Sequence, residues 1–262
     1  YLVMEYVDGR DLHVVVKEEG PLKYERAADY VAQVARGLDH AHEMGLVHRD
    51  IKPANCLLDQ NGTVKLLDMG LARLIGDEAS LTLENNENVL GTADYLAPEQ
   101  ALNSHQADQR ADIYSLGCTL YFLLTGHPPF PDGTISERLL KHQVEQAPSI
   151  FNDRPDAPSS LVNICNRMMA KDPDSRFQTA GEVKDQLTEW LRDRGVEVGD
   201  SSKRSSGDST GVGSDVFRRF ANSLSSVGKE QGSAVAGPPS SGGAPRRRKE
   251  PEEDIGLAPL EE

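Results

Sequence analysis

Cysteine is scarce in this sequence, and its three copies are isolated from one another. Cys56, Cys118 and Cys165 form no C-x-x-C pair, and an odd number of cysteines does not make a closed set of disulfides. We therefore expect three free thiols, buried as small hydrophobic side chains, in a protein of the reducing cytoplasm.

Long apolar runs are also missing. No stretch of about 18 apolar residues occurs, which excludes a membrane-spanning helix within this sequence. Glu5 and Asp8 interrupt the apolar start and no basic segment precedes it, so we expect no signal peptide. A cytoplasmic protein is expected, although a first residue that is Tyr1 suggests a piece of a longer chain and leaves open a membrane anchor elsewhere in it.

Basic residues are fewer than acidic ones in residues 1–199, the part of the sequence that is rich enough in apolar residues to fold. The net charge is −14, and residues 200–262 carry nine Lys/Arg against ten Asp/Glu, so nearly all of the excess lies in residues 1–199. Nucleic-acid binding requires a basic surface. We therefore expect no nucleic-acid partner.

The composition changes near residue 199. From residue 200 onward the sequence has 12 Ser, 9 Gly and 5 Pro, and such a segment buries too little apolar surface to fold. We expect residues 196–262 to be a disordered tail or linker.

Hydrophobic periodicity predicts a mainly helical body with a little β structure, so the fold class is α+β. Residues 1–7 have the composition of a strand, and residues 56–59 and 63–68 flank a Gln-Asn-Gly turn typical of a hairpin. Helices are expected over 11–20, 24–44, 113–126, 134–146, 159–170 and 179–194, the third of them apolar on every side.

The stretch HRDIKPANCLLDQNGTVKLLDMG (48–70) places polar side chains on both sides of this hairpin. Asp50 precedes the first strand and Asp68 ends the second, so strand pairing brings two acids toward one cleft. Phosphoryl transfer requires a carboxylate to orient the attacking hydroxyl, oxygen ligands for Mg²⁺, and a cation beside the transferred group. Asp50 fits the first role and Lys52 the third. Asn55 and Asp68 fit as ligands, and oxygen donors without His or Cys favour Mg²⁺ over zinc.

Four segments resemble, in order and spacing, the signatures of eukaryotic-like (Hanks-type) bacterial Ser/Thr protein kinases. They are the catalytic-loop signature HRDIKPAN (48–55), the magnesium-loop signature DMG (68–70), the activation-segment signature GTADYLAPEQ (91–100), and DIYSLG (112–117). The resemblance covers roughly residues 1–194. It implies that residues 1–7 are the last strand of the small lobe and the hinge. Residues 8–195 would then be a mainly helical C-terminal lobe with the hairpin at its active site.

The resemblance implies a role for each matching position. Asp50 is the catalytic base, Lys52 contacts the γ-phosphate, and Asn55 and Asp68 hold Mg²⁺. ATP lies on Leu57, with Met4 as gatekeeper and the backbone of Glu5 and Val7 at the adenine.

Further positions are implied to be regulatory or structural. Arg49 pairs with a phosphate on the activation loop, where Ser80 and Thr82 are candidate sites. Thr92 contacts Asp50 and Lys52, Glu99 pairs with Arg176, Asp112 accepts hydrogen bonds from the catalytic-loop backbone, and His48 packs rather than acts as a base.

The activity implied is transfer of the γ-phosphate of ATP to Ser/Thr hydroxyls of proteins, with Mg²⁺, and with self-association for autophosphorylation. Lys52 and Thr92 favour a Ser/Thr kinase over a tyrosine kinase. A pseudokinase that acts as scaffold or regulator is the alternative, but Asp50, Lys52, Asn55 and Asp68 are all present. A small-molecule phosphotransferase is a second alternative, against which the APE-type segment and its following buried helix argue.

Two departures from the family pattern affect the expected activity. Met69 stands where the family has Phe, and since Met is also apolar we expect Asp68 to keep its role. The sequence has no G-x-G-x-x-G in a strand-turn-strand setting, no strand lysine and no helix glutamate ahead of the catalytic loop. We therefore expect this polypeptide alone to bind ATP poorly and to transfer no detectable phosphate.

Overall fold

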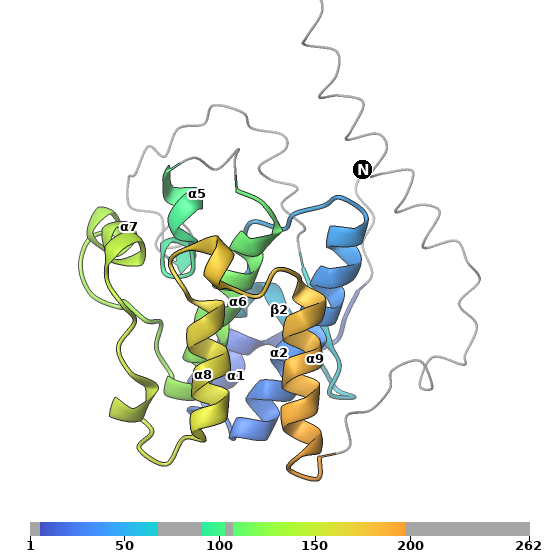
Figure 1. The fold of residues 1–262 in the computed structure, drawn as a ribbon. Helices are drawn as coiled ribbons and strands as arrows, with labels where there is room; N and C mark the ends of the chain where they lie inside the picture. The colour runs from blue at the N-terminus through green and yellow to red at the C-terminus, as the bar shows by residue number, and fades with distance from the viewer. Residues whose placement is uncertain (1–5, 68–90, 103–106, 197–262) are drawn as a thin grey trace, which may run out of the picture. The chain divides into compact units, whose positions relative to one another are not determined.

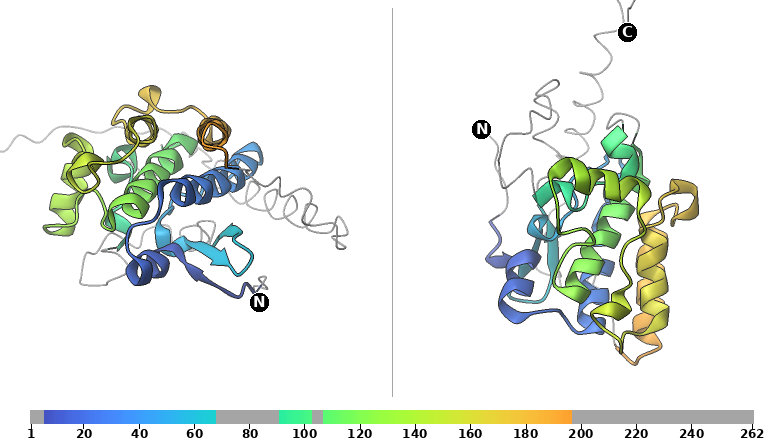
Figure 2. Two further views of the ribbon diagram at one scale, coloured as in Figure 1. Left: turned by 90° about the horizontal axis from the view of Figure 1, so that it is seen from below. Right: turned by 90° about the vertical axis from the view of Figure 1, so that its left-hand side faces the viewer.

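Two long helices, α2 (Tyr24–Glu43) and α6 (Gln109–Thr125), form the central layer of the computed structural model, which describes residues 6–67, 91–102 and 107–196 (Figure 1). On one side of this layer lie α8 (Ser159–Met168) and α9 (Ala180–Arg192), which pack on α6 and α2 respectively. On the other side lie α1 (Leu12–Glu19) and a small sheet (Figure 2, left). Two further helices, α5 (Pro98–Leu102) and α7 (Ile135–Val144), contact each other.

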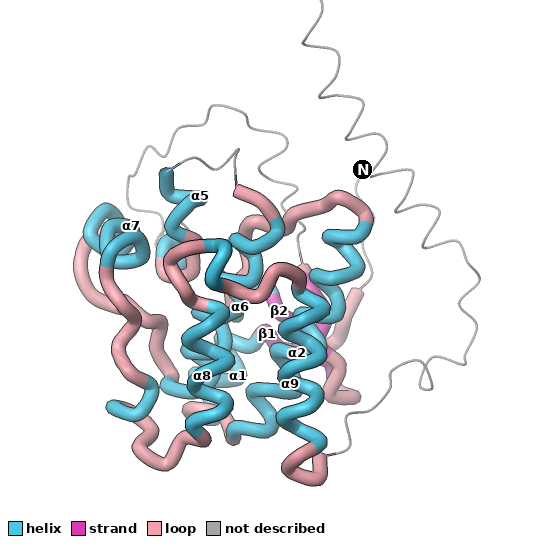
Figure 3. Tube along the Cα trace, in the orientation of Figure 1, coloured by secondary structure: helices cyan, strands magenta, loops and turns pink. Residues whose placement is uncertain are grey.

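The six helices predicted from hydrophobic periodicity are present, within a few residues at each end, whereas the short helix α5 was not predicted. In α1, Asp11 accepts a hydrogen bond from the Val14 N–H at 2.9 Å, and Gly20 ends the helix with a φ of 79°. In α2, the apolar residues that recur at helical spacing are all buried: Ala27, Tyr30, Val31, Val34, Leu38 and Ala41. With three short strands added, the helix-rich chain confirms the α+β class (Figure 3).

The helix α6 is buried on every face from Ala111 to Thr125, as predicted, although it begins four residues earlier than expected. Its Ser and Thr hydroxyl groups donate to the carbonyl four residues before: Ser115 to Ala111, Thr119 to Ser115, and Thr125 to Tyr121, at 3.1, 2.9 and 2.9 Å. Because these bonds stay within the helix, the Ser and Thr hydroxyl groups are satisfied without a partner from another element.

The sheet has three antiparallel strands in the order β1 (Gly9–Asp11), β2 (Cys56–Asp59), β3 (Val64–Leu66). The pairing of β2 with β3 confirms the predicted hairpin. No strand was predicted at β1. Gly9 lies opposite Asp59, and a Cβ at Gly9 would lie 2.3 Å from the Leu58 carbonyl oxygen, so this close approach of the strands requires glycine.

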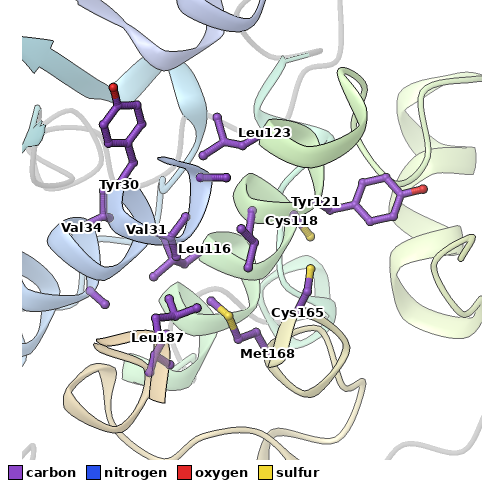
Figure 4. Packing of buried hydrophobic residues seen from close by; sticks show 14 of the residues in the cluster. Tyr30, Val31, Val34, Leu116, Cys118, Tyr121, Leu123, Cys165, Met168 and Leu187 are labelled. Carbon is purple, nitrogen blue, oxygen red and sulfur yellow. The ribbon is translucent and has the colours of Figure 1, made fainter. Parts of the chain in front are cut away.

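The three cysteines are free and buried, as the sequence predicts. Cys118 and Cys165 lie among apolar side chains of α6 and α8, close to Leu116 and Met168 (Figure 4). Burial raises the pKa of the Cys56 and Cys118 thiols to about 12, and it raises the pKa of Cys165 as well. These thiols are therefore protonated and unreactive at neutral pH.

Several predictions fall on residues 1–5, 68–90, 103–106 and 197–262, which lie outside the described residues. They include the predicted tail and most of the strand predicted over 1–7. Tyr6 and Val7, the described end of that strand, are not in a strand, because β2 ends opposite Gly9 and offers them no partner. None of the helices in the described ranges is long and apolar enough to cross a membrane.

Candidate active site

Asp50 lies in the loop between α2 and β2, and two side chains hold one of its carboxylate oxygens. Oδ2 accepts a hydrogen bond from Asn55 Nδ2 at 2.9 Å and pairs with Lys52 Nζ at 3.1 Å. The other oxygen, Oδ1, has no hydrogen-bond partner among the described residues. Since the side chain is 29% exposed, the site presents a fixed carboxylate with one acceptor open to an incoming group.

The residues around Asp50 are brought together by a tight turn and by a contact with a distant part of the chain. The 3₁₀ turn η1 (Pro53–Asn55) folds Asn55 back, so that its Nδ2 also donates to the Asp50 carbonyl oxygen at 2.8 Å. Lys52 Nζ reaches 40 residues along the chain and donates to Thr92 Oγ1 at 2.8 Å. The structure thus brings together four of the predicted residues: Asp50, Lys52, Asn55 and Thr92.

Asp112, in the first turn of α6, holds the backbone that leads into Asp50. Its two oxygens accept hydrogen bonds from the His48 N–H at 2.8 Å and the Arg49 N–H at 2.7 Å. Asp112 is fully buried, and these two contacts with the loop backbone are the ones that the resemblance implies. His48 is buried too, with Nε2 2.9 Å from the Leu67 carbonyl oxygen, so it packs beneath the loop.

Two residues that hold the loop leading into Asp50 were not predicted from the sequence. His42 Nε2, in α2, lies 2.8 Å from Asp112 Oδ2, and both side chains are buried. Gln100 Nε2, in α5, donates to the Arg49 carbonyl oxygen at 3.0 Å. His42 lies outside the four signature segments, and Gln100 is the last residue of GTADYLAPEQ, next to Glu99. The only signal available in the sequence was this position in or near the signature segments.

Glu99 and Arg176 form a bidentate ion pair, with N–O distances of 2.7 and 2.9 Å. The Arg176 side chain is completely buried and also donates to three backbone carbonyl oxygens, those of Ala170, Arg110 and Lys171. Because all its donors are used, the guanidinium is held without an unpaired charge. The pair ties α5 to the start of α6, on which Asp112 is mounted.

A second ion pair connects the segment carrying Thr92 to α7. Asp94 Oδ1 lies 2.7 Å from Arg138 Nη1, and both side chains are only 13% exposed. Burial raises the pKa of the Asp94 carboxyl, and the facing Arg138 opposes that shift without cancelling it.

The residues expected to hold nucleotide are only partly within the described chain. Leu57 lies on β2 and is half-buried, on the face opposite to the buried Cys56 and Leu58. Val7 is half-buried in the segment before β1. Met4, Glu5 and Asp68 lie outside the described residues, as do the candidate phosphorylation sites Ser80 and Thr82.

The donor set fits a hard cation only in part within the described residues. No group of three or more His, Cys, Asp or Glu side chains there could hold a metal ion. Asn55 uses its amide nitrogen on Asp50, and its Oδ1 accepts no hydrogen bond from the described residues. An amide oxygen of this kind is a suitable Mg²⁺ ligand beside a carboxylate.

Comparison with known sequences finds one family over most of the chain. The family model described as "Protein kinase domain" matches residues 1–188. A probable serine/threonine-protein kinase of Streptomyces coelicolor is 42% identical over 186 residues, which cover 70% of this chain and 27% of that protein. Serine/threonine-protein kinase PknB of Mycolicibacterium smegmatis is 39% identical over 187 residues, covering 71% and 30%. The chain spans less than a third of the length of these relatives.

Comparison with solved structures gives the same fold. The crystal structure of Rad53 1-466 in complex with AMP-PNP superposes with a TM-score of 0.57 at 26% identity, covering 72% of this chain and 46% of that one. The Rad53 kinase domain with SCD2, in complex with AMPPNP, gives a TM-score of 0.56 at 27% identity, covering 72% and 68%.

Proposed function

The chain belongs to the protein kinase family, and we propose that it is the large lobe of an enzyme that transfers the γ-phosphate of ATP to Ser or Thr hydroxyls of proteins. Residues 8–195 would form this lobe, residues 1–7 the last strand of the small lobe and the hinge, and residues 196–262 a linker or tail. The similar proteins carry the serine/threonine-kinase name, which supports the proposed substrate class.

One observation carries the proposal: the asymmetric environment of the Asp50 carboxylate. Oδ2 is held by Lys52 and Asn55, whereas Oδ1 is left without a described partner. A substrate hydroxyl that donates its hydrogen bond to Oδ1 would be oriented by a carboxylate that cannot rotate. The carboxylate would then receive the hydroxyl proton as the new P–O bond forms and the bond from the γ-phosphorus to the departing ADP oxygen breaks.

Lys52 supplies the positive charge of the site. Its ammonium lies between Asp50 Oδ2, at 3.1 Å, and Thr92 Oγ1, at 2.8 Å, so it is fixed beside the carboxylate rather than free in solvent. A fixed cation at this place would stabilise charge on the transferred phosphoryl oxygens. Asn55, with Asp68, would hold Mg²⁺, which would supply positive charge to offset the charge of the phosphates.

Arg49 is the proposed receiver of a regulatory phosphate. Its Nε is buried and has no hydrogen-bond partner among the described residues, whereas buried guanidinium donors are ordinarily paired. A phosphate on Ser80 or Thr82 would supply acceptors of the right charge. Self-association would deliver that phosphate by autophosphorylation.

The test is Asp50→Asn in the protein expressed from its complete reading frame, with a basic peptide or protein substrate and labelled ATP. Asparagine keeps the size of the side chain but cannot take a proton, so we expect kcat to fall by about 10²- to 10⁴-fold while ATP still binds. Asp185→Asn, an exposed acid on α9, is the matched control and should keep the parent's rate.

The pseudokinase alternative gives a different pattern. In that case the parent would transfer no phosphate, and Asp50→Asn would leave its cellular phenotype intact. Equal turnover by the parent and Asp50→Asn would also contradict the proposal, because it would show that the carboxylate takes no part.

A further inference from the structure

The backbone at Arg49 is held in a conformation that its own side chain disfavours. Arg49 has a φ of 64°, and no other non-glycine residue in the described ranges has a positive φ. A residue with a Cβ pays for this left-handed conformation in steric energy, and it persists only where its surroundings fix it.

Hydrogen bonds hold the peptide units on both sides of Arg49. Its N–H donates to Asp112 Oδ1 at 2.7 Å, and its carbonyl oxygen accepts from Gln100 Nε2 at 3.0 Å. The N–H of Asp50, in the same peptide unit as that carbonyl, points to His48 Nδ1 at 3.3 Å. The plane of the peptide between Arg49 and Asp50 is therefore fixed at its oxygen by Gln100 and at its nitrogen by His48.

Gln100 is itself fixed in place. It is 4% exposed, and its Oε1 lies 3.4 Å from the Ala97 N–H. Its neighbour in α5, Glu99, pairs with the buried Arg176. Two successive residues of α5 thus face different parts of the lobe: Glu99 pairs with Arg176, and the Gln100 amide binds the catalytic loop at Arg49. Only a side chain with both a donor and an acceptor can make these two contacts.

We infer that Gln100 is a positioning residue for phosphoryl transfer, which holds the Arg49 carbonyl and thereby sets the direction of the Asp50 side chain. The inference rests on the proposed function. Without the Gln100 amide, the carbonyl loses its donor and Arg49 is free to leave the left-handed region. The peptide plane then turns, and with it the carboxylate that must meet the substrate hydroxyl.

The first experiment measures kcat and KM for Gln100→Met and Gln100→Glu in the protein from its complete reading frame. Met keeps the length of the side chain without polar atoms, and ionised Glu keeps an acceptor but cannot donate. We expect both to lower kcat by about 10- to 100-fold, the size of effect that a misplaced reacting group produces, with KM for ATP unchanged. Gln186→Met, on α9, is the control for loss of a glutamine amide and should keep the parent's kcat. An unchanged kcat in Gln100→Met with a folded protein would overturn the inference.

The second experiment separates positioning from a general effect on folding. Glycine adopts a positive φ without steric cost, so the fold-loss in kcat caused by Gln100→Met should be smaller in an Arg49→Gly background than in the parent. An equal fold-loss in both backgrounds would mean that Gln100 does not act through the conformation of residue 49.

The third measurement does not depend on activity. Crystal structures of the parent and Gln100→Met should differ at residue 49, with φ positive in the parent and negative in the variant. A φ that stays positive with the same peptide orientation would overturn the inference. If the parent transferred no phosphate, the proposed function would fail, while these structures would still decide whether Gln100 holds the loop.

Discussion

The buried histidine of α7 gives the lobe a calculable dependence of stability on pH. His142 is fully buried, with Nδ1 2.9 Å from the Tyr114 hydroxyl and its ring edge-to-face with Tyr114 and Phe130. Lys171 Nζ donates to its carbonyl oxygen at 2.7 Å. Burial, reinforced by the positive charge of Lys171, lowers the pKa of His142 from 6.5 to about 3.

The sign of the effect follows from which state binds the proton. Between pH 6.5 and pH 3 the unfolded chain protonates this histidine and the folded chain does not, so stability is complete above pH 6.5 and falls as the pH drops toward 3. The loss between pH 7 and pH 5 is about 2 kcal/mol, and it is the same for any folded pKa below about 4. Asp94, whose pKa is raised, acts in the opposite direction at lower pH.

The assay is urea unfolding of the parent and His142→Asn at pH 7, 6 and 5. Asparagine retains a polar atom for the Tyr114 hydroxyl but does not titrate. We expect the parent to lose about 2 kcal/mol more than the variant between pH 7 and pH 5. His40→Asn, at an exposed position of α2, controls for the loss of a histidine as such. Parallel pH curves for the parent and His142→Asn would refute the reasoning.

Two further predictions concern the packing of the lobe. Arg176→Met leaves Glu99 without its partner and removes five hydrogen bonds, so urea unfolding should show a loss of about 3–5 kcal/mol. Gly117→Ala should cost about 1–3 kcal/mol, since the new methyl would lie 2.8 Å from Met168 Cβ and from Met169 Cγ, where α6 meets α8.

Matched controls separate these effects from substitution in general. Arg194→Met removes a half-exposed arginine and should change stability by less than about 1 kcal/mol. Gly37→Ala, inside α2, meets only the Leu66 side chain, with Cδ1 at 3.4 Å, and should stabilise the lobe by about 0.5–1 kcal/mol. If Gly37→Ala and Gly117→Ala shifted stability in the same direction and by the same amount, packing at Gly117 would not be the cause.

The helical part of the fold was predictable because each helix carries its own periodic signal. The apolar face of α2 and the wholly apolar stretch in α6 needed no knowledge of what they contact. β1 carries no such signal: Gly9, Arg10 and Asp11 are not apolar, and they form a strand only because β2 offers them backbone partners. Local sequence does not contain that information.

The residues of the site also divide into those that the sequence predicts and those that only the fold reveals. Asp50, Lys52 and Asn55 lie within six residues of one another, so the motif that contains them points to their chemistry directly. His42 is 70 residues from Asp112, and Gln100 is 51 residues from Arg49, so these contacts exist only once the chain has folded. The left-handed backbone at Arg49 is likewise a product of tertiary contacts, since arginine has no preference for it.

Asp112 is part of the buried helix α6, and its side chain binds the backbone of the loop that ends at Asp50. Because a single carboxylate accepts from His42, His48 and Arg49, the loop is supported directly by the interior of the lobe. Destabilising substitutions at distant core positions would then lower the fraction of molecules whose active site is formed, and the turnover number of each active molecule would stay the same. Titration of active sites would therefore give a lower concentration of active enzyme for such variants than for the parent.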